Sequence, residues 1–140
     1  MLLRHKFSFP MKRLLLILIS FAAIHACTPE SDPDNAREDF LGDWTCNEYE
    51  GDFAPQTYNV EILASGTGKS VLIVGLYNQG SNFVLSGYVD GRTLFINTQT
   101  VDGFNIGGSG NMANSFDRIE LSFTADDGSG SDNVKATLLR

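Results

Sequence analysis

Histidine is absent from most of this chain. Of the 140 residues only two are histidine, His5 and His25, and both lie within the first 26 residues. The rest of the chain cannot build the Ser-His-Asp or Cys-His groupings that use imidazole as a general base, and metal sites there lack their commonest ligand. The acids of residues 126–132 do not have EF-hand spacing, and no pair of acids is singled out for glycoside hydrolysis. We expect a protein that is not an enzyme and that uses no metal and no cofactor.

Long apolar runs are also missing, with one exception. Residues 14–24 form an apolar run of 11 residues behind the basic pair Lys12 and Arg13. A membrane-spanning helix needs about 20 apolar residues, so this run is too short. A basic head, a short apolar run and a small residue before a cleavage site are typical of a secretory signal peptide. We assign residues 1–26 to such a peptide, with translation starting at Met1 or Met11.

Cysteine is scarce, since Cys27 and Cys46 are the only two. Cys27 follows Ile24, His25 and Ala26, and this stretch resembles a bacterial lipobox except at His25. The resemblance implies cleavage before Cys27, a thioether-linked lipid on its sulfur, and acylation of the new amino group with a chain such as palmitate. Cys46 is then a free thiol that packs as a small apolar residue. The alternative is an ordinary signal peptide cut after Ala26, with a disulfide between Cys27 and Cys46.

Basic residues are few once the leader is removed. Residues 27–140 keep six lysines and arginines against 17 acids, a net charge of −11. Nucleic acid is excluded as a partner, because phosphate binding needs a basic surface. An anionic membrane repels the body of such a protein, whereas acyl chains contribute about 0.8 kcal/mol per buried methylene. The expected location is the cell envelope, as an outer-membrane lipoprotein attached through Cys27.

The segment after this cysteine has no large apolar residue. Residues 27–38, CTPESDPDNARE, are rich in proline and acids, a composition that cannot bury enough surface to fold. We interpret them as an extended tether. The early acids resemble the surface-export signals of some Gram-negative lipoproteins, and an acidic linker without such a signal is the alternative. The folded domain is expected over residues 39–140.

Within that domain, apolar and polar residues alternate between turns rich in Gly, Asn, Asp and Ser. This period of two indicates strands with one buried face. The pair Asp90-Gly91 is a strong hairpin signal, because both central residues of a type I′ turn need positive φ. The pattern predicts eight strands, over residues 43–50, 56–63, 70–77, 82–89, 92–101, 104–112, 117–125 and 133–140.

The connections between these strands are short and leave no room for a crossover helix. Consecutive strands must therefore be antiparallel neighbours. Eight meandering strands hide both edges when the sheet closes on itself. We predict an all-β fold, an eight-stranded antiparallel up-and-down barrel, with a two-sheet sandwich as the alternative.

The first and last strands of this domain carry residues that form a further sequence pattern. The first strand begins with Gly42-Asp43-Trp44, and the last ends at Arg140. A Gly-x-Trp at the start of strand one and an arginine at the end of the last strand resemble the calycin superfamily of lipocalins and fatty-acid-binding proteins. The closest likeness is to small bacterial lipocalin-like lipoproteins. The resemblance implies that Arg140 covers Trp44 and that the two residues, with Gly42, seal one end of the barrel.

Most of the residues expected to point inward are bulky. They are Tyr58, Ile62, Leu72, Phe83, Leu94, Ile119 and Phe123. Against them, five glycines at positions 75, 87, 107, 108 and 110 leave room. An eight-stranded barrel is just wide enough to be filled by side chains or to hold one small molecule, so both outcomes stay open.

Two functions therefore remain. In the first, the barrel binds a small apolar ligand at the end away from Trp44, against Tyr58, Phe83 and Phe123. We expect that ligand to be neutral, because no charged residue apart from Arg140 is expected inside. In the second, the barrel is filled by its own side chains, and the protein is an interaction or structural lipoprotein that recognises another protein.

Overall fold

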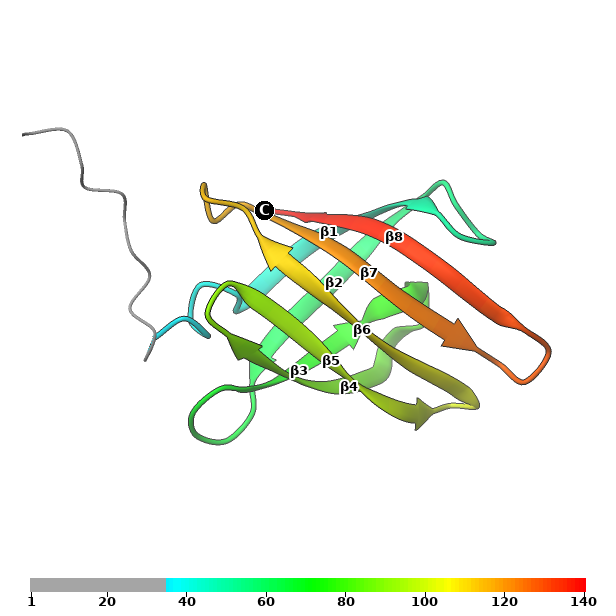
Figure 1. The fold of residues 1–140 in the computed structure, drawn as a ribbon, viewed down its shortest axis with the longest axis horizontal. Helices are drawn as coiled ribbons and strands as arrows, with labels where there is room; N and C mark the ends of the chain where they lie inside the picture. The colour runs from blue at the N-terminus through cyan, green and yellow to red at the C-terminus, as the bar shows by residue number, and fades with distance from the viewer. Residues whose placement is uncertain (1–34) are drawn as a thin grey trace, which may run out of the picture. The chain divides into compact units, whose positions relative to one another are not determined.

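The computed structural model describes residues 35–140, which form a closed barrel of eight strands (Figure 1). Each strand pairs antiparallel with the next, and β8 pairs back to β1. The strands are β1 (Gly42–Glu50), β2 (Gln56–Ala64), β3 (Ser70–Gly75), β4 (Gly80–Asp90), β5 (Thr93–Val101), β6 (Phe104–Met112), β7 (Arg118–Asp126) and β8 (Ser131–Leu139). The predicted up-and-down barrel is confirmed, and the sandwich alternative is wrong. The signal peptide, Cys27 and most of the proposed tether lie outside the described residues.

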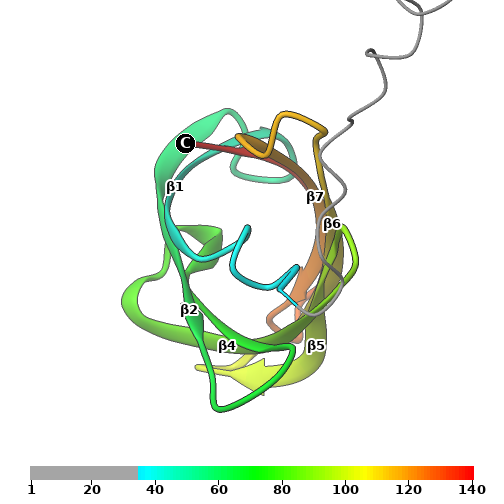
Figure 2. The same cartoon turned by 90° about the vertical axis from the view of Figure 1, so that its left-hand side faces the viewer.

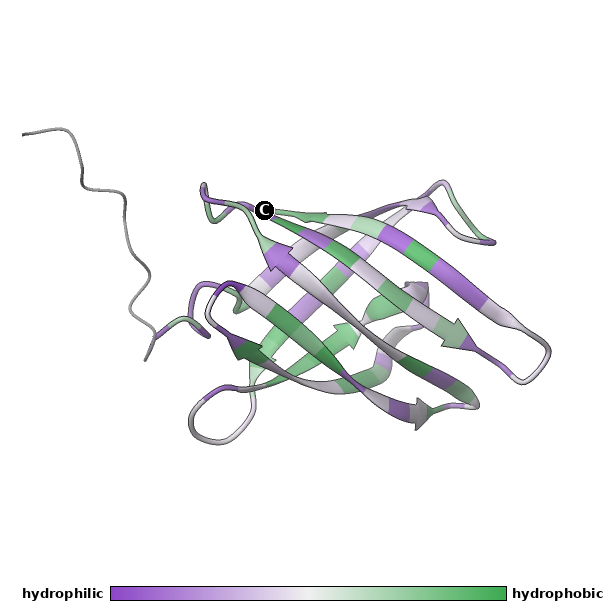
Figure 3. Ribbon diagram, in the orientation of Figure 1, coloured by the Kyte–Doolittle hydropathy of each residue, from purple (hydrophilic) through white to green (hydrophobic). Residues whose placement is uncertain are grey.

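The period-two pattern of the sequence becomes the two faces of the barrel wall. Along β8, for example, Asp132, Val134, Ala136 and Leu138 are buried, while the residues between them are exposed or half-buried (Figure 3). Successive side chains of a strand point to opposite faces, and in a closed barrel the inner face is the core. Burial of one face therefore fixes the register of each strand against its neighbours.

β3 differs from the prediction in two ways. It ends at Gly75, and the next residues, Leu76–Asn78, form a short 3₁₀ turn, η1, instead of continuing the strand. Gly75 has a φ of 82°, in the left-handed region, which glycine adopts at little cost and which turns the chain out of the strand. In addition, Leu72 points outward rather than inward. Its neighbour Ile73 is the buried residue, because Ile73 pairs with the inward-facing Ile62 on β2.

One end of the barrel is covered by the segment that leads into β1. Residues 35–40 form tight turns, in which the N–H of Glu38 donates to the Asn35 carbonyl at 2.9 Å and that of Phe40 to the Arg37 carbonyl at 3.0 Å. Ala36 and Phe40 are buried in the core, and the segment crosses the ring of strands (Figure 2). Residues 36–38, which the sequence analysis assigns to the tether, are thus part of the folded unit.

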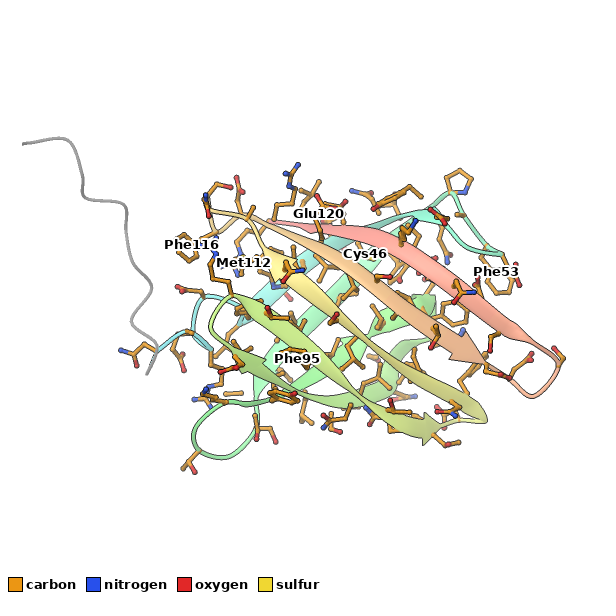
Figure 4. All side chains as sticks on the ribbon, viewed as in Figure 1. Cys46, Phe53, Phe95, Met112, Phe116 and Glu120 are labelled. Atoms are coloured by element: carbon orange, nitrogen blue, oxygen red, sulfur yellow. The ribbon has the colours of Figure 1, made fainter. Side chains whose placement is uncertain are left out.

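The two ends of the barrel are built differently. At the end where β1 begins and β8 finishes, the covering segment lies over the ring of strands, and we call this the closed end (Figure 2). At the other end, β1 finishes and β8 begins; we call it the mouth. Phe116 marks the closed end and Phe53 the mouth (Figure 4).

Candidate functional site

The closed end is sealed by Trp44 and Arg140. The indole N–H of Trp44 donates to the Phe40 carbonyl at 2.8 Å. The guanidinium carbon of Arg140 lies 3.9 Å from the centre of the Trp44 ring, and the same guanidinium donates to the Asp39 carbonyl at 2.6 Å. These are the two side chains that the sequence analysis expects to touch. The two residues lie near opposite ends of the domain sequence, and the pairing of β1 with β8 brings them together in space.

Gly42 begins β1 beside this contact. Its φ of 113° is outside the range that side chains adopt readily, so the turn from the covering segment into β1 favours glycine. The closed end is therefore a structural seal. The Trp44 and Arg140 side chains both bond to the covering segment, and we take the mouth, at the other end, as the candidate functional site.

A single side chain, Tyr77, fills the mouth. It projects from η1, between β3 and β4, and only 5% of its surface is exposed. Its ring meets Phe104 of β6 at 5.6 Å between centroids, Phe123 of β7 at 6.0 Å and Phe53 of the β1–β2 loop at 5.6 Å, all edge to face. In the closed strand order, β3 and β4 lie across the barrel from β7 and β8. Tyr77 therefore reaches across the mouth and closes it.

Hydrogen bonds hold Tyr77 in this position. Its hydroxyl donates to Oδ2 of Asp132 at 2.9 Å, and its backbone N–H donates to the Tyr58 hydroxyl at 3.0 Å. Burial, followed by the bond to Asp132, raises the pKa of the Tyr77 phenol. The phenol therefore keeps its proton and remains a donor to Asp132. The backbone of Tyr77 is left-handed, with φ 59° and ψ 26°, so these contacts also offset a local strain.

Two buried acids line this end of the barrel, and the sequence analysis missed both. Asp132 also accepts the N–H of Asp52 at 2.9 Å. Glu48 accepts the Tyr58 hydroxyl on one oxygen and the Gln56 amide at 2.5 Å on the other. Among residues 35–140 neither acid forms an ion pair. The expectation that no ionisable residue except Arg140 points inward is wrong, since two carboxyl groups line the mouth, hydrogen-bonded to hydroxyl, amide and backbone N–H groups.

A signal for these acids was present in the strand pattern. Glu48 has the same parity on β1 as the buried Trp44 and Cys46, and Asp132 has that of Val134 on β8. Buried carboxylates are rare unless they are partnered. Tyr58 lies 10 residues from Glu48 on the neighbouring strand, whereas Tyr77 lies 55 residues from Asp132, and the strand pattern alone reveals neither bond.

The three residues proposed to contact a ligand, Tyr58, Phe83 and Phe123, are all buried. Phe83 packs edge to face on Phe104 at 6.2 Å, and Phe123 packs on Tyr77. The Tyr58 hydroxyl donates to Glu48. Burial raises the pKa of the Tyr58 phenol, and the neighbouring Cys46 and Glu48 raise it by a smaller amount. The structure brings the three beneath Tyr77, where their partners are other residues of the core.

The glycines do not open a chamber inside the barrel. A Cβ atom on Gly110 would lie 2.8 Å from the Ile119 side chain and 3.0 Å from that of Leu121. A Cβ on Gly87 would lie 3.2 Å from Cδ1 of Ile73 and 2.4 Å from a backbone oxygen. Neighbouring side chains therefore occupy the space that these glycines leave, and the expectation that glycine provides room for a ligand is wrong at both positions.

A hollow of about 290 Å³ lies outside Tyr77. Phe53, Tyr77 and Phe104 provide its aromatic lining, and Asp52, Asp127 and Asp132 provide acids. Phe53 is 63% exposed. The hollow is a shallow rim to the mouth, and its acidic lining disfavours fatty acids and other anions.

The described residues contain no group of three or more His, Cys, Asp or Glu placed to hold a metal ion. Within the same residues, no helix has the length and apolar character needed to cross a membrane. Cys46 is buried and has no disulfide partner among residues 35–140, and burial raises the pKa of its thiol to about 12, which suits a packing role rather than a nucleophile. No family model, curated protein or solved structure matches the chain.

Proposed function

We propose that the protein is an exported, lipid-anchored barrel without enzymatic activity, filled by its own side chains, that works by recognising another macromolecule through its outer surface. The observation that carries this proposal is the closure of the mouth by Tyr77. A barrel that stores a ligand needs an open route to a chamber, and here the route is occupied by a ring packed on three other aromatic rings.

Export and lipidation rest on the sequence of the leader. The stretch Ile24 to Cys27 resembles a lipobox, and the net charge of −11 disfavours attachment to an anionic membrane by charge. A lipid on Cys27 would place the barrel at the outer membrane or cell surface, within reach of neighbouring proteins. The likeness to small lipocalin-like lipoproteins agrees with the Trp44–Arg140 seal, and is part of the proposal.

Binding of a small apolar ligand is the second candidate. The hollow outside Tyr77 favours it, because Phe53 and Phe104 offer apolar surface there. For this function Tyr77 would have to leave the mouth, breaking its bond to Asp132. A ligand would then gain the space of one tyrosine ring and meet Phe83 and Phe123 below.

Dye binding separates the two candidates. The chain from residue 28 onward is titrated with an environment-sensitive apolar dye, with lipid extract as competitor. A filled barrel gives no saturable dye signal that lipid displaces. Tyr88→Lys identifies dye that binds the outer surface of the barrel. Tyr88 is 41% exposed, so this substitution alters the outer surface only, and dye bound there should be lost. A saturable signal that lipid displaces and Tyr88→Lys leaves unchanged would overturn the filled-barrel proposal in favour of the ligand-binding one.

A further inference from the structure

The charges of this acidic protein are unevenly spread around the barrel. β3, β5 and β6 contain no charged residue, and β4 has only Asp90, at its last position, paired with Lys69. Besides the inward Glu48 and Asp132, the other strands carry outward charges, at Asp43, Glu50, Glu61, Arg118, Glu120, Asp126 and Lys135. We call the outer faces of β3–β6 the uncharged wall. It lies on the side opposite to β1 and β8 (Figure 1).

Apolar side chains lie together on this wall. Val74 of β3 pairs with Val84 of β4, and Tyr88 of β4 pairs with Phe95 of β5. The Tyr88 and Phe95 rings stack with their centroids 4.8 Å apart. Leu72 lies beside Val74 on the same face of β3, and the outward residues between and around them are serine, threonine, asparagine and glutamine, with the Asp90–Lys69 pair at the edge.

This patch differs from ordinary surface exposure. Single exposed apolar residues are common on proteins, whereas a contiguous group bordered by polar residues marks an interaction site. Val84 and Tyr88 are 36% and 41% exposed. Phe95 of β5 is separated by one strand, β6, from Glu120 of β7, where the charged part of the barrel wall begins (Figure 4). We propose that the uncharged wall is an interface and that its occupant is the same wall of a second copy of this chain.

The uneven charge distribution favours this wall as the contact between two copies. Two copies with a net charge of −11 each repel one another over most orientations. Pairing the uncharged walls turns the charged outer faces of β1, β2, β7 and β8 away from the contact in both copies, which keeps the like charges as far apart as two barrels allow. The side chains of the wall are also self-complementary, since apolar groups meet apolar groups, and hydroxyl and amide groups serve as both donors and acceptors.

The geometry of the chain permits this pairing at a membrane. The wall runs along the side of the barrel, whereas the chain enters at Asn35, at the closed end. A two-fold axis parallel to the barrels places both closed ends on the same side. Two copies anchored in one membrane through lipid on Cys27 can then associate without reversing either of them. This inference deepens the proposed function, on which it rests, by naming the partner.

Association is tested by sedimentation equilibrium on the chain from residue 28 onward. This chain contains the whole barrel, because all eight strands and every described core residue lie between residues 36 and 139. We expect a concentration-dependent dimer that persists or strengthens as salt screens the repulsion between the charged walls. Tyr88→Lys and Val84→Lys should each weaken it by about tenfold or more, as expected for substitution within an interface core.

Tyr49→Lys is the matched control. Tyr49 is 57% exposed on the outer face of β1, and this substitution makes the same change of side chain and charge on the charged side of the barrel. It should leave the dimer intact. A chain that stays monomeric at every concentration and salt, or that loses its dimer equally in Tyr49→Lys and Tyr88→Lys, would overturn the inference.

Other occupants give different results. The chain could remain monomeric, bind vesicles of a zwitterionic phospholipid, and lose that binding in Tyr88→Lys. This result would assign the wall to a lipid surface instead. The apolar dye titration on the same samples keeps the two proposals apart. If the chain is monomeric and takes up no dye, the dimer is rejected and the filled barrel stands. If the chain takes up dye that lipid displaces, and Tyr88→Lys leaves this uptake unchanged, the filled barrel is rejected.

Discussion

Replacing Tyr77 should both destabilise the barrel and open its mouth. Tyr77→Ala removes a buried ring that packs on Phe53, Phe104 and Phe123. Truncation of a large aromatic residue in a core costs about 3–5 kcal/mol, and we expect a decrease of this size in the free energy of unfolding. Three aromatic rings border the space that the Tyr77 ring vacates, so this variant should also bind the environment-sensitive dye that the wild type does not.

Two companion substitutions separate the contributions of the side chain and the backbone. Tyr77→Phe keeps the ring but removes the donor to Asp132, a bond to a charged group worth about 1.5–3 kcal/mol, and should not admit dye. Tyr77→Gly removes the ring but tolerates the left-handed backbone, for which a residue with a Cβ pays about 1–2 kcal/mol. Glycine should therefore cost less stability than alanine at this position.

Urea denaturation gives the unfolding free energies, and dye fluorescence gives the state of the mouth. The exposed Tyr49 provides the control, since Tyr49→Ala should change stability by about 0.5 kcal/mol or less and bind no dye. If Tyr77→Ala costs under about 1 kcal/mol, or if it excludes dye as the wild type does, Tyr77 does not close the mouth.

Three other predictions concern the seal, the free thiol and the anchor. Trp44→Ala should lower the free energy of unfolding by about 3–5 kcal/mol and Arg140→Ala by about 0.5–2 kcal/mol, whereas the exposed Arg118→Ala should change it little; equal losses in urea denaturation for Arg140→Ala and Arg118→Ala would contradict the seal. Burial raises the pKa of Cys46 from 9.0 to about 12. The unfolded thiol loses its proton first, so stability should fall between about pH 9 and pH 12, by up to about 1.4 kcal/mol per pH unit from this group. Cys46→Ala should show a smaller slope, and an unchanged slope would exclude Cys46 as the cause. Cells supplied with a traceable fatty acid should label the wild type but not Cys27→Ala, and label on Cys27→Ala would show that the lipid is attached elsewhere.

The barrel was predictable because the alternation of apolar and polar residues and the short turns, which determine it, are local features of the sequence. Val134, Ala136 and Leu138 alternate with polar residues along β8, and short hairpin turns, such as Gly91-Arg92 between Asp90 and Thr93, leave only antiparallel neighbours possible. The predicted central pair Asp90-Gly91 is wrong by one residue, because Asp90 still pairs with Thr93. The pairing of the first and last strands then follows from closure, and with it the approach of Trp44 and Arg140.

The mouth was not predictable in the same way. Leu76 and Tyr77 continue the apolar run of β3, so nothing local shows that the left-handed Gly75 ends the strand and sends Tyr77 across the barrel. Its contacts come from β6, β7 and β8, at separations of up to 55 residues. Similarly, Ala36 belongs to a polar stretch of sequence, and it is buried because the segment of residues 35–40 packs onto the core. Interactions between distant segments decide these features, and a pattern of neighbours does not contain them.

Native mass spectrometry tests the filled barrel most directly. The chain from residue 28 onward is incubated with total lipid extract, separated from free lipid and sprayed under conditions that preserve non-covalent complexes, with Tyr77→Ala alongside as the opened form. The account predicts that the wild type retains only the mass of its own chain, as monomer or dimer, while Tyr77→Ala gains bound apolar molecules. A wild-type protein that carries a stoichiometric small molecule from the extract would contradict it.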